Sequence, residues 1–98
     1  MSPRSPDPVR AARQLEIRNS LGLHARAAAL LVQALARFDA EITVSKDDQT
    51  VNGKSILGLM MLAAGQGSWI EVVAHGPDAE AALDTITALV EAKFNEEA

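Results

Sequence analysis

The stretch of sequence that decides the fold is residues 41–52, which read EITVSKDDQTVN. Polar and apolar residues alternate from Glu41 to Ser45, turn-forming residues occupy 46–49, and residues 50–52 supply a short partner strand. This pattern predicts a β-hairpin. Because alternating strands have one covered and one solvated face, they indicate an antiparallel sheet with helices stacked on a single side.

The segments on both sides of this hairpin supply two more strands and three helices. Alternation predicts strands at residues 14–18 and 68–74. Apolar residues at spacings of three and four predict helices at residues 25–38 and 79–94, and Ser55 is a good N-cap for a short third helix. The resulting order, β-α-β-β-α-β-α, predicts an α+β open-faced β-sandwich, with a four-stranded antiparallel sheet and three helices on one face.

The length of the chain, 98 residues, allows one domain. Pro3, Pro6 and Pro8 lie in the first thirteen positions, where no periodicity of 2 or 3.6 is visible. We therefore expect residues 1–13 to form a flexible N-terminal extension and residues 14–98 to form the folded domain.

The composition excludes several classes of protein. The net charge of -4 has the wrong sign for binding a phosphate backbone, and 3% aromatic residues cannot form a base-stacking surface, so no nucleic-acid partner is expected. The absence of cysteine excludes disulfides and thiolate chemistry. The longest apolar runs, 27–32 and 59–64, are too short to span a membrane, and no apolar stretch follows the N-terminal arginines. We expect a cytoplasmic protein.

The chemistry is concentrated around His24, which closes a loop immediately before a predicted helix. The free amides of a first helical turn carry the positive end of the helix dipole and bind anions. Arg26 can add a charge-assisted hydrogen bond to a phosphate, and Gly22 allows close approach of another protein. The residues alone leave two interpretations open: a histidine that binds or carries an anion, and a histidine that acts as a neutral helix cap.

Several segments together resemble HPr, the family of histidine-containing phosphocarriers of the bacterial phosphotransferase system. The resemblance covers about residues 14–95. The segments that carry it are Asn19-Ser20-Leu21-Gly22-Leu23-His24-Ala25-Arg26, Phe38-Asp39-Ala40-Glu41-Ile42, Val51-Asn52-Gly53-Lys54-Ser55-Ile56-Leu57-Gly58-Leu59-Met60 and Ala64-Gly65-Gln66-Gly67. Two separated motifs in the family order are far more specific than either motif alone, and they favour the carrier interpretation of His24.

The resemblance implies a phosphoryl carrier that is not itself an enzyme and needs no cofactor. His24 matches the histidine whose Nδ1 accepts a phosphoryl group from phosphoenolpyruvate by way of enzyme I and passes it to an enzyme IIA protein. Arg26 matches the arginine beside it, and the amides of Ala25 and Ala27 are expected to bind the phosphate. The family usually has proline where this chain has Ala27, a departure that bears on the rate of transfer.

Two further predictions come from the same resemblance. Docking of partner proteins is expected at Leu23, Ile56, Leu57 and Met60, because exposed apolar residues suit a surface that accepts several partners. Ser55 matches a serine that an HPr kinase/phosphorylase modifies in some members, which would add that enzyme as a partner. The alternative role of Ser55 is a plain helix cap. A monomer is expected.

A different class of function also fits a small domain of this pattern. Compact βαββαβ modules bind small effectors without any phosphotransfer, although such a sensor has no use for a loop histidine next to Arg26. No metal site is predicted, because His24 and His75 with scattered acidic residues do not form a spaced ligand set. The sequence leaves open whether a carrier of this kind serves sugar uptake or the nitrogen-related branch.

Overall fold

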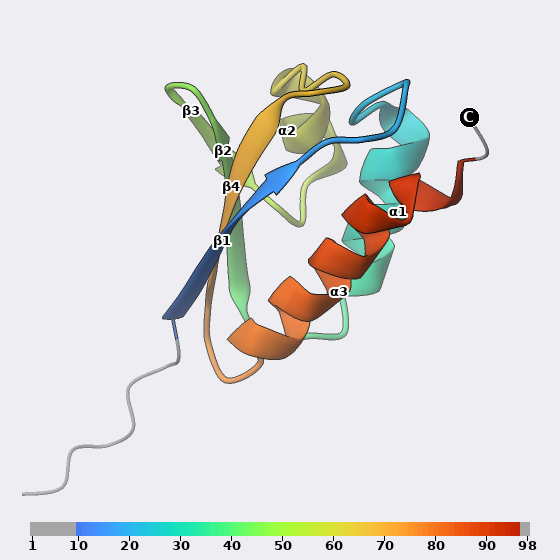
Figure 1. The fold of residues 1–98 in the computed structure, drawn as a ribbon. Coiled ribbons are helices and arrows are strands. Elements are labelled where there is room, and N and C mark those ends of the chain that lie inside the picture. The colour runs from blue at the N-terminus through green and yellow to red at the C-terminus, as the bar shows by residue number, and fades with distance from the viewer. Residues whose placement is uncertain (1–9, 97–98) are drawn as a thin grey trace, which may run out of the picture.

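The computed structural model describes residues 10–96, and residues 1–9 and 97–98 lie outside the described part of the chain. The elements, in chain order, are β1 (Arg10–Glu16), α1 (Ala25–Leu35), β2 (Glu41–Lys46), β3 (Gln49–Asn52), α2 (Ile56–Met61), β4 (Trp69–His75), α3 (Ala79–Glu91) and a short 3-10 turn, η1 (Lys93–Asn95) (Figure 1). Four strands in one sheet and three α-helices confirm the predicted α+β open-faced sandwich.

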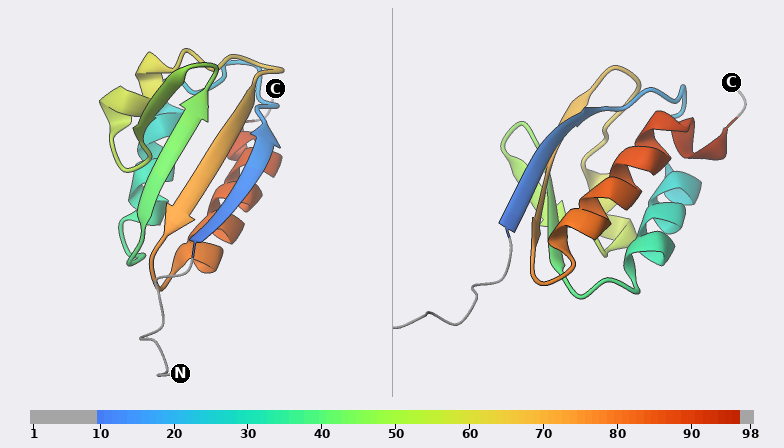
Figure 2. Two further views of the ribbon diagram at one scale, coloured as in Figure 1. Left: turned by 90° about the vertical axis from the view of Figure 1, so that its left-hand side faces the viewer. Right: turned by 60° about the horizontal axis from the view of Figure 1, so that its bottom comes forward.

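The sheet is antiparallel throughout, and its strands lie in the order β1-β4-β2-β3. The predicted hairpin is formed by β2 and β3, in which Val44 pairs with Val51. On the other side of β2, Val44 pairs with Val72 of β4. Ile70, two residues earlier in β4, pairs with Leu15 of β1. The left view of Figure 2 shows the strands in front and the helices behind them, so one face of the sheet is covered and the other is open.

The core lies between the covered face of the sheet and the helices. Apolar side chains spaced by three and four residues are buried on α1, at Ala28, Leu31 and Leu35, and on α3, at Leu83 and Ile86. Burial of each large aliphatic side chain contributes about 1.5–3 kcal/mol relative to leaving it exposed. Within residues 10–96, no helix is long and apolar enough to cross a membrane.

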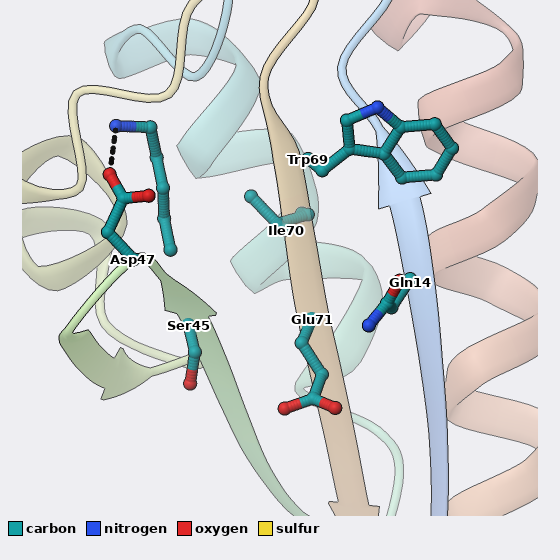
Figure 3. A pocket seen from close by; sticks show the side chains of 7 residues that line it. Gln14, Ser45, Asp47, Trp69, Ile70 and Glu71 are labelled. Carbon is teal, nitrogen blue, oxygen red and sulfur yellow. Dashed lines mark hydrogen bonds and ion pairs between the residues drawn. The ribbon is translucent and has the colours of Figure 1, made fainter.

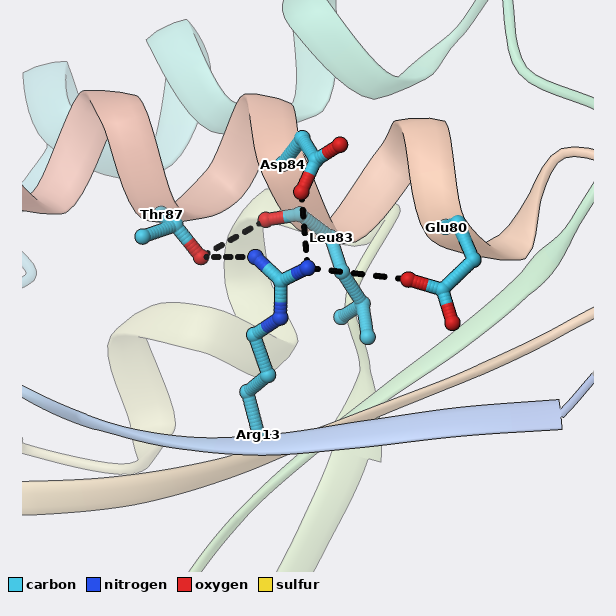
Figure 4. A network of polar contacts seen from close by, with 5 residues as sticks. All are labelled: Arg13, Glu80, Leu83, Asp84 and Thr87. Carbon is cyan, nitrogen blue, oxygen red and sulfur yellow. Dashed lines mark hydrogen bonds and ion pairs between the residues drawn. The ribbon is translucent and has the colours of Figure 1, made fainter.

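The first strand begins four residues earlier than predicted, at Arg10. Arg13 lies on the covered side of β1, and a charged residue there hides the alternation that predicts a strand. Its guanidinium donates to Asp84 Oδ1 at 2.7 Å and to Thr87 Oγ1 at 2.9 Å, both on α3 (Figure 4). The prediction of an extension over residues 1–13 is therefore wrong for its last four residues, and the others lie outside the described part of the chain.

Two helices are shorter than predicted. α1 ends at Leu35, whose carbonyl accepts a hydrogen bond from the Phe38 amide at 3.0 Å and so closes a turn. α3 ends at Glu91, and the three residues of η1 then have φ values of 57°, 53° and 64°. Phe94 is buried within this left-handed turn instead of continuing the helix. Residues 93–96, called the terminal turn below, redirect the chain after α3 toward the segment that precedes α1.

Candidate functional site

The structure places His24 in the N-cap position of α1, with extended backbone at φ -81° and ψ -179°. Its carbonyl accepts a hydrogen bond from the Ala28 amide at 2.9 Å, which is the first of the helical pattern. The side chain is 28% exposed, so the imidazole can be reached from solvent. Because the first-turn amides of a helix have no partner inside it and carry the positive end of the dipole, this position favours a negatively charged group.

The loop that carries His24 is fixed against the chain that follows α2. Gly22 has a φ of +67°, and a Cβ atom there would lie 2.4 Å from the carbonyl oxygen of Ala64, so the position requires glycine. The amide of Leu23 donates to the same carbonyl at 2.9 Å. These contacts hold the histidine in one place relative to α2.

The two ring nitrogens of His24 face different partners. Nδ1 accepts a hydrogen bond from the Arg26 amide at 3.3 Å, which points this nitrogen toward the first turn of α1. The amides of Ala25 and Ala27 belong to the same turn. Arg26 is exposed, and within residues 10–96 no carboxylate forms an ion pair with its guanidinium. The Arg26 amide therefore lies on the Nδ1 side of the ring, in the same helical turn as the amides of Ala25 and Ala27.

Glu96, a residue that the sequence analysis did not identify, lies on the other side of the ring. Its Oε2 atom is 2.5 Å from His24 Nε2 and accepts a hydrogen bond from Asn19 Nδ2 at 3.0 Å. The hydrogen bond from His24 is the main cause that holds the pKa of the Glu96 carboxyl below its usual range, while desolvation acts in the opposite direction and Asn19 and Arg26 contribute less. No sequence pattern indicates this contact, since 72 residues separate the two side chains.

An apolar patch lies on the loop before His24 and on α2. It consists of five exposed side chains: Leu21, Ile56, Leu57, Met60 and Met61. Three of them were predicted to dock partners, whereas Leu21 and Met61 were not. The predicted contribution of Leu23 is wrong, because its side chain is buried in the core. Leu21 and His24 line the same open hollow with Ala63 and Ala64, the residues that follow α2, so the Leu21 part of the patch lies beside the imidazole.

Ser55 occupies the N-cap position of α2. Its Oγ atom accepts a hydrogen bond from the Gly58 amide at 3.0 Å, so the capping role predicted for this serine is present. The side chain is half-buried and is followed directly by Ile56 of the apolar patch. A phosphoryl group on Ser55 would place negative charge at the edge of that patch.

The other hollows and the second histidine offer less chemistry. A hollow on the open face of the sheet is lined by Gln14, Trp69 and Glu71 and contains no histidine (Figure 3). His75 is exposed at the end of β4. Among residues 10–96, no three histidine, aspartate or glutamate side chains converge as metal ligands would. The chemistry of the described chain is therefore concentrated at His24.

A small α+β domain that presents a partly exposed histidine at a helix N-terminus, with exposed apolar side chains on the same loop and on α2, has the features of a phosphocarrier. The family model of the PTS HPr component phosphorylation site matches residues 11–92. The chain is 51% identical over 84 residues to phosphocarrier protein NPr of Shewanella violacea, covering 86% of this chain and 92% of that protein. It is also 51% identical over 83 residues to phosphocarrier protein HPr of Treponema pallidum, covering 85% and 94%.

Solved structures agree with these relatives. HPr-C-His from Thermoanaerobacter tengcongensis superposes with a TM-score of 0.86 at 44% identity, covering 90% of this chain and 99% of that one. Crh from Bacillus subtilis, described as a domain-swapped dimer, superposes with a TM-score of 0.69 at 41% identity, covering 83% and 93%. The chain belongs to the HPr family of phosphocarrier proteins.

Proposed function

We propose that this chain is a cytoplasmic phosphocarrier of the phosphoenolpyruvate-dependent phosphotransferase system. In this proposal, Nδ1 of His24 accepts a phosphoryl group from enzyme I and passes it to an enzyme IIA protein. The chain turns over no substrate by itself, because it is modified by one partner and demodified by the next. It needs no cofactor for this role.

The observation that carries the proposal is the orientation of the His24 ring. Nδ1 points at the Arg26 amide in the first turn of α1, so a phosphoryl group on Nδ1 would meet that amide, the amides of Ala25 and Ala27, and the positive end of the helix dipole. The Arg26 guanidinium could add a charge-assisted hydrogen bond. These donors would screen the charge of the phosphoryl group. Because the His24 ring stays accessible, a second protein could still reach the phosphoryl group.

The apolar patch supports a protein as the donor and as the acceptor. Exposed methionine and leucine side chains beside a reactive group give contact area that adapts to different partners. Ser55 at the edge of this patch stays a candidate for regulatory phosphorylation by an HPr kinase/phosphorylase. Monomeric state also stays a prediction, since a relative of the same fold is a swapped dimer.

The test is incubation of the full chain with enzyme I and phosphoenolpyruvate, followed by intact mass measurement before and after mild acid. A single added phosphoryl group that acid removes is expected for the wild-type chain. His24→Ala is expected to gain none while keeping its circular dichroism spectrum, because the side chain lies at the surface of a loop. His75→Ala is the matched control, since it removes the other histidine and should be modified like the wild type. Acid-labile phosphate on His24→Ala would overturn the proposal.

A further inference from the structure

We propose that Glu96 is a positioning residue for His24: its carboxylate keeps the proton on Nε2, leaves Nδ1 unprotonated as the nucleophile, and balances the charge that the ring gains during transfer. This inference rests on the proposed function and adds to it a residue of the terminal turn. Asn19 takes part by holding the carboxylate in place.

The hydrogen-bond partners of the ring select one tautomer. The Arg26 amide can only donate, so Nδ1, which faces it, must be the acceptor nitrogen. An ionised carboxylate can only accept, so Nε2, which faces Glu96 Oε2, must carry the proton. Both contacts favour the same neutral form, in which the lone pair of Nδ1 points toward the anion-binding turn.

The carboxylate also matters for the charge of the ring during transfer. When the Nδ1 lone pair forms the bond to phosphorus, the bond between phosphorus and the donor breaks and its electron pair leaves with the donor. The proton stays on Nε2, so the ring becomes positively charged next to Glu96. In the onward step, a nucleophile of the acceptor protein forms the new bond to phosphorus, the N–P electron pair returns to Nδ1, and the ring leaves as neutral imidazole. A fixed negative charge at Nε2 stabilises the charged ring in both directions.

Asn19 fixes the position of the carboxylate. It is a fully buried polar residue, and its Nδ2 atom donates to the Gly22 carbonyl at 2.9 Å and to Glu96 Oε2 at 3.0 Å. Its Oδ1 atom is buried without a hydrogen-bond partner in the described chain. Burying an amide oxygen without a hydrogen-bond donor costs free energy. The position of the Asn19 side chain is therefore set by the two hydrogen bonds that its Nδ2 atom donates. One amide thus ties the His24 loop to the terminal turn.

The backbone of the terminal turn gives independent support. Lys93, Phe94 and Asn95 all lie in the left-handed region, which disfavours residues with a side chain. Phe94 is buried and anchors the turn in the core. Figure 1 shows the chain after α3 turning beside α1. Strained backbone is enriched at functional sites, and the residue that follows this turn is Glu96, whose carboxylate contacts His24.

The experiment compares the wild-type chain with Glu96→Gln and Glu96→Ala, and uses Glu91→Ala as a matched control. Glu91 is an exposed acid at the end of α3 and lines a hollow that does not include His24. Its replacement by alanine changes the net charge of the chain by the same amount as Glu96→Ala. Two quantities are measured: the His24 tautomer from ¹⁵N chemical shifts of the ring, and the rate of phosphoryl transfer from enzyme I as separate kcat and KM values.

The two variants are expected to separate the two roles of the carboxylate. Glu96→Gln keeps an acceptor for Nε2–H but has no charge, so the Nε2–H tautomer persists while kcat falls by roughly tenfold. Glu96→Ala loses both, so the ring becomes a mixture of tautomers and kcat falls further. KM for enzyme I stays within about twofold in both variants, since the apolar patch is untouched. Glu91→Ala behaves like the wild type in every measurement.

The outcomes distinguish this inference from the proposed function. Wild-type tautomer and wild-type kcat in Glu96→Ala would overturn the role of Glu96 and leave His24 as the carrier. A faster reaction in Glu96→Ala would also overturn it, because the carboxylate would then be an inhibitory contact. Failure of the wild-type chain to accept phosphate would refute the proposed function, whereas the tautomer measurement in the absence of phosphate would still test the contact.

Discussion

The N-terminal ends of α1 and α2 differ in how their caps are made. At α2, Ser55 accepts a hydrogen bond from the Gly58 amide at 3.0 Å, an ordinary cap that satisfies one first-turn donor. At α1, His24 accepts from the Arg26 amide at 3.3 Å through a ring nitrogen, and the other nitrogen contacts Glu96. The first end is built for helix stability. The second has a longer cap bond, and its acceptor is the ring nitrogen that would carry the phosphoryl group.

The largest effect is expected from giving α1 the cap that α2 has. His24→Ser supplies one of the preferred N-cap side chains, so the helix should remain folded. Acid-labile phosphorylation by enzyme I should disappear completely, because a serine hydroxyl forms an acid-stable ester if it reacts at all. Intact mass before and after acid, together with a circular dichroism melt, measures both properties. Acid-labile phosphate on this variant would show that His24 is not the acceptor.

A second substitution tests the apolar patch, which lies on the loop before α1 and on α2. Met60→Glu places a charge without a partner in the apolar patch and should weaken binding to enzyme I by roughly tenfold to a hundredfold. Titration calorimetry with enzyme I measures this loss. Trp69→Glu is the control, since Trp69 is also a large exposed apolar residue but lines the hollow on the open face of the sheet. Equal losses in both variants would place the interface elsewhere.

A smaller effect is expected at Ser55, the N-cap of α2. Ser55→Ala removes the acceptor for the Gly58 amide and should lower the free energy of unfolding by about 1 kcal/mol. Acid-labile phosphorylation at His24 should continue at the wild-type level. Denaturant unfolding and the mass assay measure these separately. Ser55→Thr, which retains a hydroxyl, is the control and should recover most of the stability. A variant that is as stable as the wild type would mean that the cap contributes nothing.

The contrast between the two ends also shows what a sequence can reveal. Alternation over Glu41 to Ser45 predicts the hairpin. His24 and Arg26 at the start of a predicted helix indicate an anion-binding helix end. Both features can be predicted because they are local in the sequence. Arg13 and Glu96 act on distant elements, and only the folded chain brings their partners close. Leu23 looks available for docking in the sequence, yet the fixed loop turns it into the core.

The smallest effect concerns the pH dependence of stability at the His24 end. The hydrogen bond from His24 lowers the pKa of Glu96 in the folded chain, so the ionised carboxyl stabilises the fold above the unfolded glutamate pKa of about 4.3. That contribution is lost as the pH falls through the lowered folded-state pKa. Glu96→Gln cannot ionise and should therefore lack this dependence.

Thermal melts of the wild type and of Glu96→Gln, taken from neutral pH down to about pH 3, measure this contribution as the difference between the two curves. The wild type should be more stable at neutral pH, and the difference should shrink as Glu96 becomes protonated. Glu91→Gln controls for the loss of one exposed carboxyl elsewhere on the chain. A difference that stays constant over this range would mean that the Glu96 carboxyl makes no charge-dependent contact with His24, and the contrast between the two helix ends would then reduce to the length of their cap hydrogen bonds.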